Sequence, residues 1–283
     1  ISKYMTNSFR FLFGILSILV VSSCSAPEKE TKKEEVVEIT YDSTDTHTYA
    51  QKQDAYVTHL FWDAEIDLEN HIITATATWD FVNVSDTDTI IFDMVDLKIK
   101  DVKLDNGEST GFKIGESIPH MGAPLYVAIT PETKSVRISY ESDPSAGAVL
   151  WLSPEQTYGK KHPFMFTQSE AILARSWIPC QDSPGIKFTY DAKVTVPKDL
   201  LALMSATNPQ TKNESGTYEF KMSQPIPSYL MALAVGDLEF GSLGERTGVY
   251  AEPGQLDAAV YEFGETEKMV QIAEELFGPY RRE

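Results

Sequence analysis

The stretch that decides the fold is ITATATWDF, residues Ile73–Phe81. Apolar and polar side chains alternate along it, and this period of two places each kind on one face of an extended strand. The apolar face comprises Ile73, Ala75, Ala77, Trp79 and Phe81, and the polar face Thr74, Thr76, Thr78 and Asp80. The pattern predicts an antiparallel strand with one buried face.

The same period recurs along much of the chain, in segments 136–140, 188–196 and 218–222. Turn-forming residues lie between these segments, at 105–107, 208–209 and 214–216. Many short strands separated by turns are typical of a sandwich or an open curved sheet. The sequence therefore predicts a mainly β domain over residues 51–250.

The period changes after residue 250. From Leu256 to Phe277 apolar residues recur every three or four positions, which predicts helix, with Gly264 as a point where the helix could break. We expect residues 251–283 to be the beginning of a second domain, of which the chain holds only the first helix or helices.

Residues 1–24 have the pattern of a lipoprotein-type signal peptide. Arg10 precedes an apolar run, residues 11–21, that is too short to span a bilayer. The run Val21-Ser22-Ser23-Cys24 resembles a lipobox, which predicts lipidation of Cys24 and a membrane-anchored location in a bacterial cell envelope, periplasmic or surface-exposed. The alternative is an ordinary secretion signal with an incidental cysteine.

The rest of the N-terminus and the overall charge limit the possible functions. Residues 25–50 are rich in charges and predict a solvated tether. The formal net charge of −18 argues against a nucleic-acid partner, because phosphates would be repelled. With Cys24 lipidated, Cys180 is the one cysteine left, so no intramolecular disulfide is expected.

The run TQSEAILARSWIPCQDSP, Thr167–Pro184, places charged residues in apolar surroundings. Burying a charge costs several kcal/mol unless the charge finds a partner. Taken alone, the run favours a buried ion pair between Glu170 and Arg175. A second interpretation pairs Arg175 with Asp182, seven residues later in the sequence, to brace the loop. Cys180 is expected to be a small buried hydrophobe.

Three long segments resemble the N-terminal domain of the zinc aminopeptidase family of leukotriene A(4) hydrolase and aminopeptidase N. They are WLSPEQTYGKKHPFMFTQSEAILARSWIPCQDSPGIKFTYDAKVTVPKDLLALMSA (Trp151–Ala206), PIPSYLMALAVGDLE (Pro225–Glu239) and YEFGETEKMVQIAEELFGPY (Tyr261–Tyr280). The resemblance covers Thr58–Tyr280. It implies a β-saddle domain that packs on a thermolysin-like catalytic domain.

The resemblance also gives roles to individual residues. In the family motif T-Q-x-E-x-x-x-A-R, the glutamate anchors the free α-amine of a peptide substrate, and here it is Glu170. Gln168 is implied to lie beside the first substrate residue. Leukotriene A(4) hydrolase itself has glutamine at the position of Glu170, so the resemblance points to general aminopeptidase activity rather than epoxide chemistry. With this motif, Arg175 and Asp182 are expected to be structural.

The family binds zinc through H-E-x-x-H and a later glutamate. The five histidines here, His47, His59, His71, His120 and His162, never occur in that spacing, and the family's Gly-x-Met-x-Asn motif is absent. We therefore expect zinc to belong to the full-length enzyme, with no metal ligand and no catalytic residue in this chain, which alone would be inactive. The alternative function is a non-catalytic, surface-anchored β-sandwich lipoprotein that binds a ligand.

Overall fold

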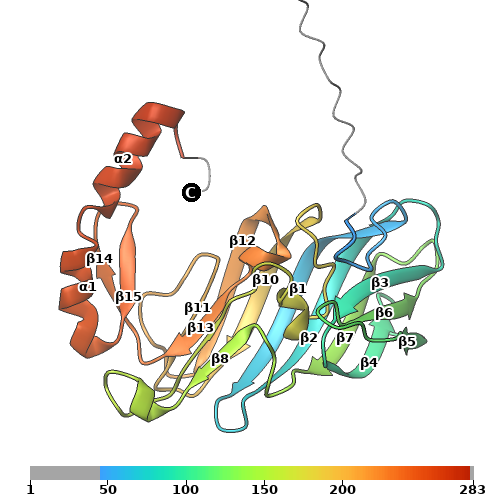
Figure 1. Cartoon of the computed structure of the whole chain (residues 1–283), viewed down its shortest axis with the longest axis horizontal. Coiled ribbons are helices and arrows are strands. Elements are labelled where there is room, and N and C mark those ends of the chain that lie inside the picture. Colours follow the sequence, from blue (N-terminus) through green and yellow to red (C-terminus); the bar gives the residue numbers. More distant parts are fainter. Residues whose placement is uncertain (1–44, 281–283) are drawn as a thin grey trace, which may run out of the picture. The chain divides into compact units, whose positions relative to one another are not determined.

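The computed structural model describes residues 45–280, and strands dominate this part of the chain (Figure 1). The strands are β1 (Ala55–Asp67), β2 (Ile72–Asn83), β3 (Thr89–Met94), β4 (Lys98–Leu104), β5 (Phe112–Ile114), β6 (Ala123–Ala128), β7 (Ser135–Glu141), β8 (Val149–Leu152), β9 (Phe164–Thr167), β10 (Lys187–Thr195), β11 (Leu201–Met204), β12 (Thr217–Pro227), β13 (Leu233–Gly236), β14 (Glu239–Ser242) and β15 (Gly248–Ala251). The predicted mainly β fold is confirmed.

The helical elements are short and few. The 3-10 helices are η1 (Pro154–Gln156), η2 (Ala174–Ser176), η3 (Ser228–Leu230) and η4 (Pro253–Gln255), and the α-helices are α1 (Leu256–Glu262) and α2 (Thr266–Phe277). The predicted helical segment is therefore present, and its break lies at residues 263–265, around Gly264. No helix within residues 45–280 is long and apolar enough to cross a membrane.

A six-stranded sheet in the order β12-β10-β1-β2-β7-β4 carries the fold. Strands β1 and β10 run parallel, and the other neighbours run antiparallel. The stretch that predicts the fold lies in β2, near the middle of this sheet. Ile73, Ala77 and Trp79 on it are fully buried, whereas the intervening threonines lie on the opposite face, at least partly exposed. The alternation in sequence thus becomes a core face and a solvent face.

Two smaller sheets, β3-β6-β5 and β11-β13-β9-β8, share their core with the apolar face of the large sheet. The ring of Trp79 on β2 meets Phe188 on β10 edge-on, with centroids 4.8 Å apart, and lies 6.2 Å from Phe92 on β3. Trp62 on β1 packs edge-on against Trp177, with centroids 5.3 Å apart. Aromatic pairs in such geometry contribute beyond the area they bury.

The helices are attached to the hairpin β14-β15. Arg246, in the hairpin turn, donates two hydrogen bonds of 2.9 Å to the carboxylate of Glu274 on α2, and its Nε donates to Glu267 at 3.3 Å. Thr247 also donates to Glu267. A bidentate guanidinium–carboxylate pair fixes orientation as well as distance. The turn of the hairpin therefore sets the position of α2 against it.

A buried cluster of charges joins segments that are far apart in the sequence. Arg175, in η2, is fully buried, and its Nε donates to Asp182 Oδ2 at 3.0 Å. Its terminal nitrogens donate to the carbonyls of Met121 and His47, at 2.8 and 2.7 Å. Asp93, on β3, lies 3.8 Å from the same guanidinium.

The carboxylate of Asp93 holds the other side of this cluster. It accepts hydrogen bonds from the Thr48 hydroxyl at 2.5 Å, the Tyr49 amide at 2.7 Å and the Asp182 amide at 2.8 Å. The cluster consequently ties residues 47–49, β3 and the loop after η2 to one guanidinium.

We predict that Arg175→Met destabilises the domain strongly. The substitution leaves two buried carboxylates without their cation, and breaking a buried pair from one side costs about 3 to 5 kcal/mol. The free energy of unfolding, measured by urea denaturation, should fall by that amount. Lys193→Met is the matched control, because it breaks the exposed pair with Asp63 and should cost about 1 kcal/mol or less. Equal losses for both variants would contradict the role of the buried cluster.

A second prediction concerns pH and α2. Hydrogen bonds from Arg246 lower the pKa of Glu274 from the ordinary 4.5 to about 2. A carboxyl group whose folded-state pKa is lowered stabilises the folded arrangement above its ordinary pKa, and this contribution is lost as the pH falls toward the folded-state value. The amide NMR signals of α2 should therefore shift between about pH 4.5 and pH 2.

In Arg246→Gln, Glu274 should titrate near its ordinary pKa, so the α2 signals should move at higher pH than in the unmodified chain. The amides of β2 provide the internal reference for general acid unfolding. Identical titration of α2 in both proteins would show that Arg246 does not hold the helix.

Candidate functional site

The candidate site is the loop of residues 168–173, which links the end of β9 to η2. It leaves the four-stranded sheet beside the start of β8, where the Gln168 amide donates to the Ala148 carbonyl at 2.8 Å. The Ala148 amide in turn donates to the Ser176 hydroxyl at 3.0 Å. Both ends of the loop are thus bound to the same short segment before β8.

A buried hydrogen-bond network holds the middle of the loop through Ser169. The Ser169 hydroxyl accepts from Trp177 Nε1 at 3.1 Å and donates to the Met231 carbonyl at 3.3 Å. The Trp177 carbonyl accepts from the Tyr140 hydroxyl, which accepts from Trp62 Nε1, both at 2.9 Å. Burial raises the pKa of Tyr140, so this hydroxyl stays a neutral donor.

Two of the segments that resemble the aminopeptidase family meet at this loop. Besides the Ser169–Met231 contact, the Leu233 amide donates to the Thr167 hydroxyl at 2.9 Å, and the Ser228 hydroxyl donates to Asp182 at 2.5 Å. The segment Pro225–Glu239 therefore supports the segment that carries Glu170. The two segments are separate in the sequence but form one structural unit.

Glu170 itself is exposed, and within residues 45–280 its carboxylate has no hydrogen bond and no ion pair. Its backbone amide donates to Gln168 Oε1 at 3.0 Å, and its peptide bond to Ala171 is cis. The alternative of a buried Glu170–Arg175 ion pair is wrong. Arg175 satisfies its charge with Asp182 and Asp93, and Glu170 remains in solvent, where an unpaired carboxylate costs little.

Gln168 is also exposed. Strand β9 ends at Thr167, and the two residues are brought together by the bend in which the Gln168 carboxamide oxygen accepts the Glu170 amide. That bond uses the carboxamide oxygen, and the carboxamide nitrogen makes no hydrogen bond within residues 45–280. The pair can present one negative charge and one neutral donor to a ligand.

Arg175 and Asp182 lie behind this loop, not at its surface. Burial raises the pKa of Asp182, and the neighbouring guanidinium opposes that rise. Cys180, between them and equally buried, has its pKa raised by burial, so the thiol is not activated. The structure brings Arg175 and Asp182 together, as the brace interpretation expected, and gives Cys180 the environment of a buried hydrophobe.

Sequence reasoning missed Asp93 and the supporting pair Ser169 and Trp177. The available signal for Asp93 was an acid in the otherwise apolar run IIFDM. Its partner could not be read from the sequence, because the Asp182 amide that donates to it lies 89 residues away.

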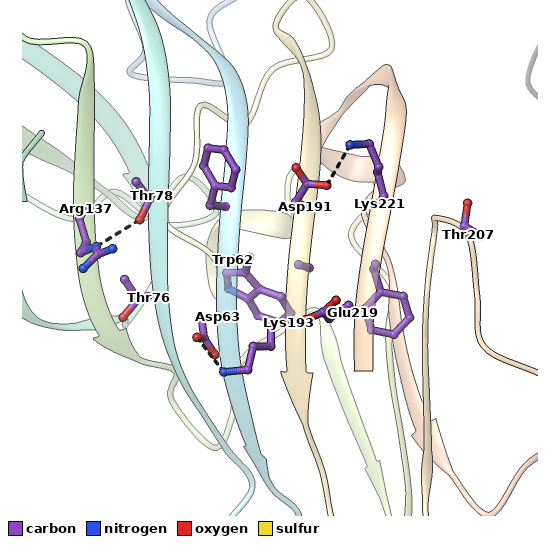
Figure 2. A pocket seen from close by; sticks show the side chains of 13 residues that line it. Trp62, Asp63, Thr76, Thr78, Arg137, Asp191, Lys193, Thr207, Glu219 and Lys221 are labelled. Atoms are coloured by element: carbon purple, nitrogen blue, oxygen red, sulfur yellow. Dashed lines mark hydrogen bonds and ion pairs between the residues drawn. The ribbon is translucent and has the colours of Figure 1, made fainter. Parts of the chain in front are cut away.

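Metal ligands do not gather in the described part of the chain. Within residues 45–280, no group of three or more His, Cys, Asp or Glu side chains could hold a metal ion, so the histidines do not form a zinc site there. Cys24 lies outside the described residues. The pocket shown in Figure 2 lies elsewhere, on the large sheet, and no residue of the loop 168–173 lines it.

Comparisons with known proteins identify relatives of this chain. The Peptidase M1 N-terminal domain family matches residues 41–230. Leukotriene A-4 hydrolase of Xenopus laevis is 38% identical over 247 residues, which are 83% of this chain and 40% of that protein. Human aminopeptidase B is 43% identical over 167 residues, 57% of this chain and 25% of that protein.

Among solved structures, yeast leukotriene A4 hydrolase in complex with bestatin has a TM-score of 0.79 and 30% identity, covering 85% of this chain and 38% of that one. The chain thus spans about two fifths, or less, of these relatives' length. Since the family match covers most of the strands of the fold and the whole candidate loop, the chain belongs to the peptidase M1 family, through its N-terminal domain.

Proposed function

We propose that this chain is the part of a zinc-dependent aminopeptidase that recognises the free amine of a peptide substrate. The carboxylate of Glu170 binds the substrate's α-ammonium, and the Gln168 carboxamide donates to a carbonyl beside it. The full-length enzyme would remove the N-terminal residue from peptides. The relatives named leukotriene A-4 hydrolase and aminopeptidase B support a peptidase of this class.

The observation that carries this proposal is the contrast between Glu170 and the charges behind it. Every charge in the buried cluster is paired, while the Glu170 carboxylate has no partner within residues 45–280 and sits on a loop held by buried hydrogen bonds. A fixed carboxylate that has no hydrogen-bond partner of its own can distinguish an ammonium from an internal amide. A hydrogen bond to a charged group contributes about 1.5 to 3 kcal/mol, enough for that discrimination.

Zinc would have to be held by residues outside the described part of the chain, because no suitable cluster lies within residues 45–280. When bound, zinc activates water and polarises the scissile carbonyl. This chain would position the substrate. When the substrate's ammonium is bound to Glu170, its first peptide bond lies at a fixed distance from the loop, and the later peptide bonds lie farther away.

We predict that Glu170→Gln, made in the full-length protein, lowers kcat/KM on an aminoacyl anilide by about tenfold to a thousandfold, or about 1.4 kcal/mol per tenfold. The substitution keeps the shape and hydrogen bonding of the side chain but removes its charge. The unfolding free energy should change by less than about 0.5 kcal/mol, because Glu170 is exposed and unpaired.

Glu132→Gln, another exposed glutamate without a partner among the described residues, is the matched control and should keep full activity. Unaltered kcat/KM in Glu170→Gln would exclude the amine-binding role. A loss of activity that only follows a loss of stability would do the same, because it would make Glu170 a structural residue.

We further propose that the protein is a lipoprotein of a bacterial cell envelope, anchored through Cys24. The support is the lipobox-like run before Cys24, followed by a charged segment. Cys24→Ala should move the protein from the detergent phase to the aqueous phase or leave its signal peptide uncleaved. Mass spectrometry of the mature N-terminus provides the decisive measurement: a terminus other than Cys24, without an acyl mass, would contradict the proposal.

A further inference from the structure

The exposed face of the large sheet holds a pocket of about 870 Å³ that the proposed function does not use (Figure 2). It lies over β7, β2, β1, β10 and β12, and most of the side chains that line it come from the solvent-facing positions of these strands. Its floor includes Phe61, a residue that is 47% exposed. The Phe61 ring packs edge-on against His59, with ring centroids 4.2 Å apart.

The charges in the middle of this face are paired with one another. Asp63 lies 3.4 Å from Lys193, and Asp191 lies 3.8 Å from Lys221 and 3.3 Å from His59. Opposite charges on neighbouring strands largely cancel each other. The central floor of the pocket is therefore close to neutral around Phe61.

Two charges, on the two outer strands of the pocket, make no ion pair within residues 45–280. Arg137 on β7 makes one hydrogen bond, from Nε to the Thr78 hydroxyl at 3.4 Å, and no ion pair within residues 45–280. Glu219 on β12 lies opposite Lys193 in the register, but Lys193 pairs with Asp63, and the Glu219 carboxylate makes no hydrogen bond or ion pair within residues 45–280. Figure 2 shows Arg137 on β7 and Glu219 on β12, with the Asp63–Lys193 pair between them.

The distance between these two side chains sets the size of a ligand. Four strand spacings separate β7 from β12. The register places Lys221 in line with Arg137 across the sheet, and Glu219 lies two residues before Lys221 on the same face of β12. With strands about 4.8 Å apart, the separation across the sheet is about 20 Å. An extended peptide advances about 3.3 Å per residue, so about five or six residues span it.

We propose that this face binds a short extended peptide with free termini, whose ammonium meets Glu219 and whose carboxylate meets Arg137. A central apolar side chain of the peptide rests on the exposed ring of Phe61. Charge complementarity at both ends favours a zwitterionic peptide over a neutral chain such as an oligosaccharide. The site does not involve Glu170 and does not depend on the proposed aminopeptidase function.

The test uses the whole chain, labelled with ¹⁵N, and the probe peptide Gly-Ala-Leu-Ala-Gly in free, N-acetylated, C-amidated and doubly blocked forms. NMR shifts of the Phe61 and Asp191 amides report binding at low ionic strength. Exposed ion pairs are weak, so blocking either terminus should raise Kd by about two- to fivefold, and blocking both by about the product. Adding salt should reduce the preference for the free peptide.

Variants assign each terminus to its partner. Arg137→Gln should weaken binding of the free peptide as much as C-amidation does, and C-amidation should then have no further effect. Glu219→Gln should weaken binding as much as N-acetylation does, and N-acetylation should then have no further effect. Lys113→Gln and Glu132→Gln, exposed residues outside the pocket, are the matched controls and should bind normally. In Glu170→Gln the peptide-induced shifts of the Phe61 and Asp191 amides should be unchanged, whereas any shifts of the loop 168–173 should weaken, which separates this site from the proposed amine anchor.

Several results would overturn the proposal. These are equal affinity for the free and the doubly blocked peptide, shifts confined to the loop 168–173, stronger binding of a neutral pentasaccharide than of the peptide, or no shifts at millimolar peptide.

Discussion

One buried guanidinium constrains the rest of this domain. A charge removed from water must be paired and fully hydrogen-bonded, and Arg175 meets that requirement only with groups from several parts of the chain. Asp182 and Asp93 supply the counter-charge, and two carbonyls complete its hydrogen bonds. Three parts of the chain therefore cannot separate without leaving a buried charge unpaired or exposing it to water: residues 47–49, strand β3 and the loop after η2.

This constraint explains how Glu170 can remain unpaired on a rigid loop. The guanidinium has its own carboxylates, so it does not compete for Glu170, although only five positions separate the two residues in sequence. Ser169 and Trp177 fix the loop from inside through neutral hydrogen bonds. A carboxylate that took part in the brace would have no free hydrogen-bonding capacity, so the amine-binding role proposed for Glu170 requires that the brace be made by other residues.

The two faces of the six-stranded sheet show a related division. One face is wholly committed to the core, where Trp79 and its aromatic neighbours exclude water. The other face is polar, and most of its charges cancel in cross-strand pairs, which leaves Arg137 and Glu219 with unmatched charge. Unmatched surface charge is cheap to maintain in water and becomes useful when a ligand brings the opposite sign.

The sequence by itself determined the local structure and much of the candidate site. Alternation in Ile73–Phe81 predicted a strand with one buried face, spacing from Leu256 predicted helix, and the motif resemblance pointed to Glu170 and Gln168. Only the tertiary structure decided that Glu170 is exposed, that Asp93 completes the cluster, and that Arg137 and Glu219 share one pocket. The reason is physical: periodicity reports which face of a strand is buried, whereas the partner of a charge depends on the register between strands that are distant in the chain.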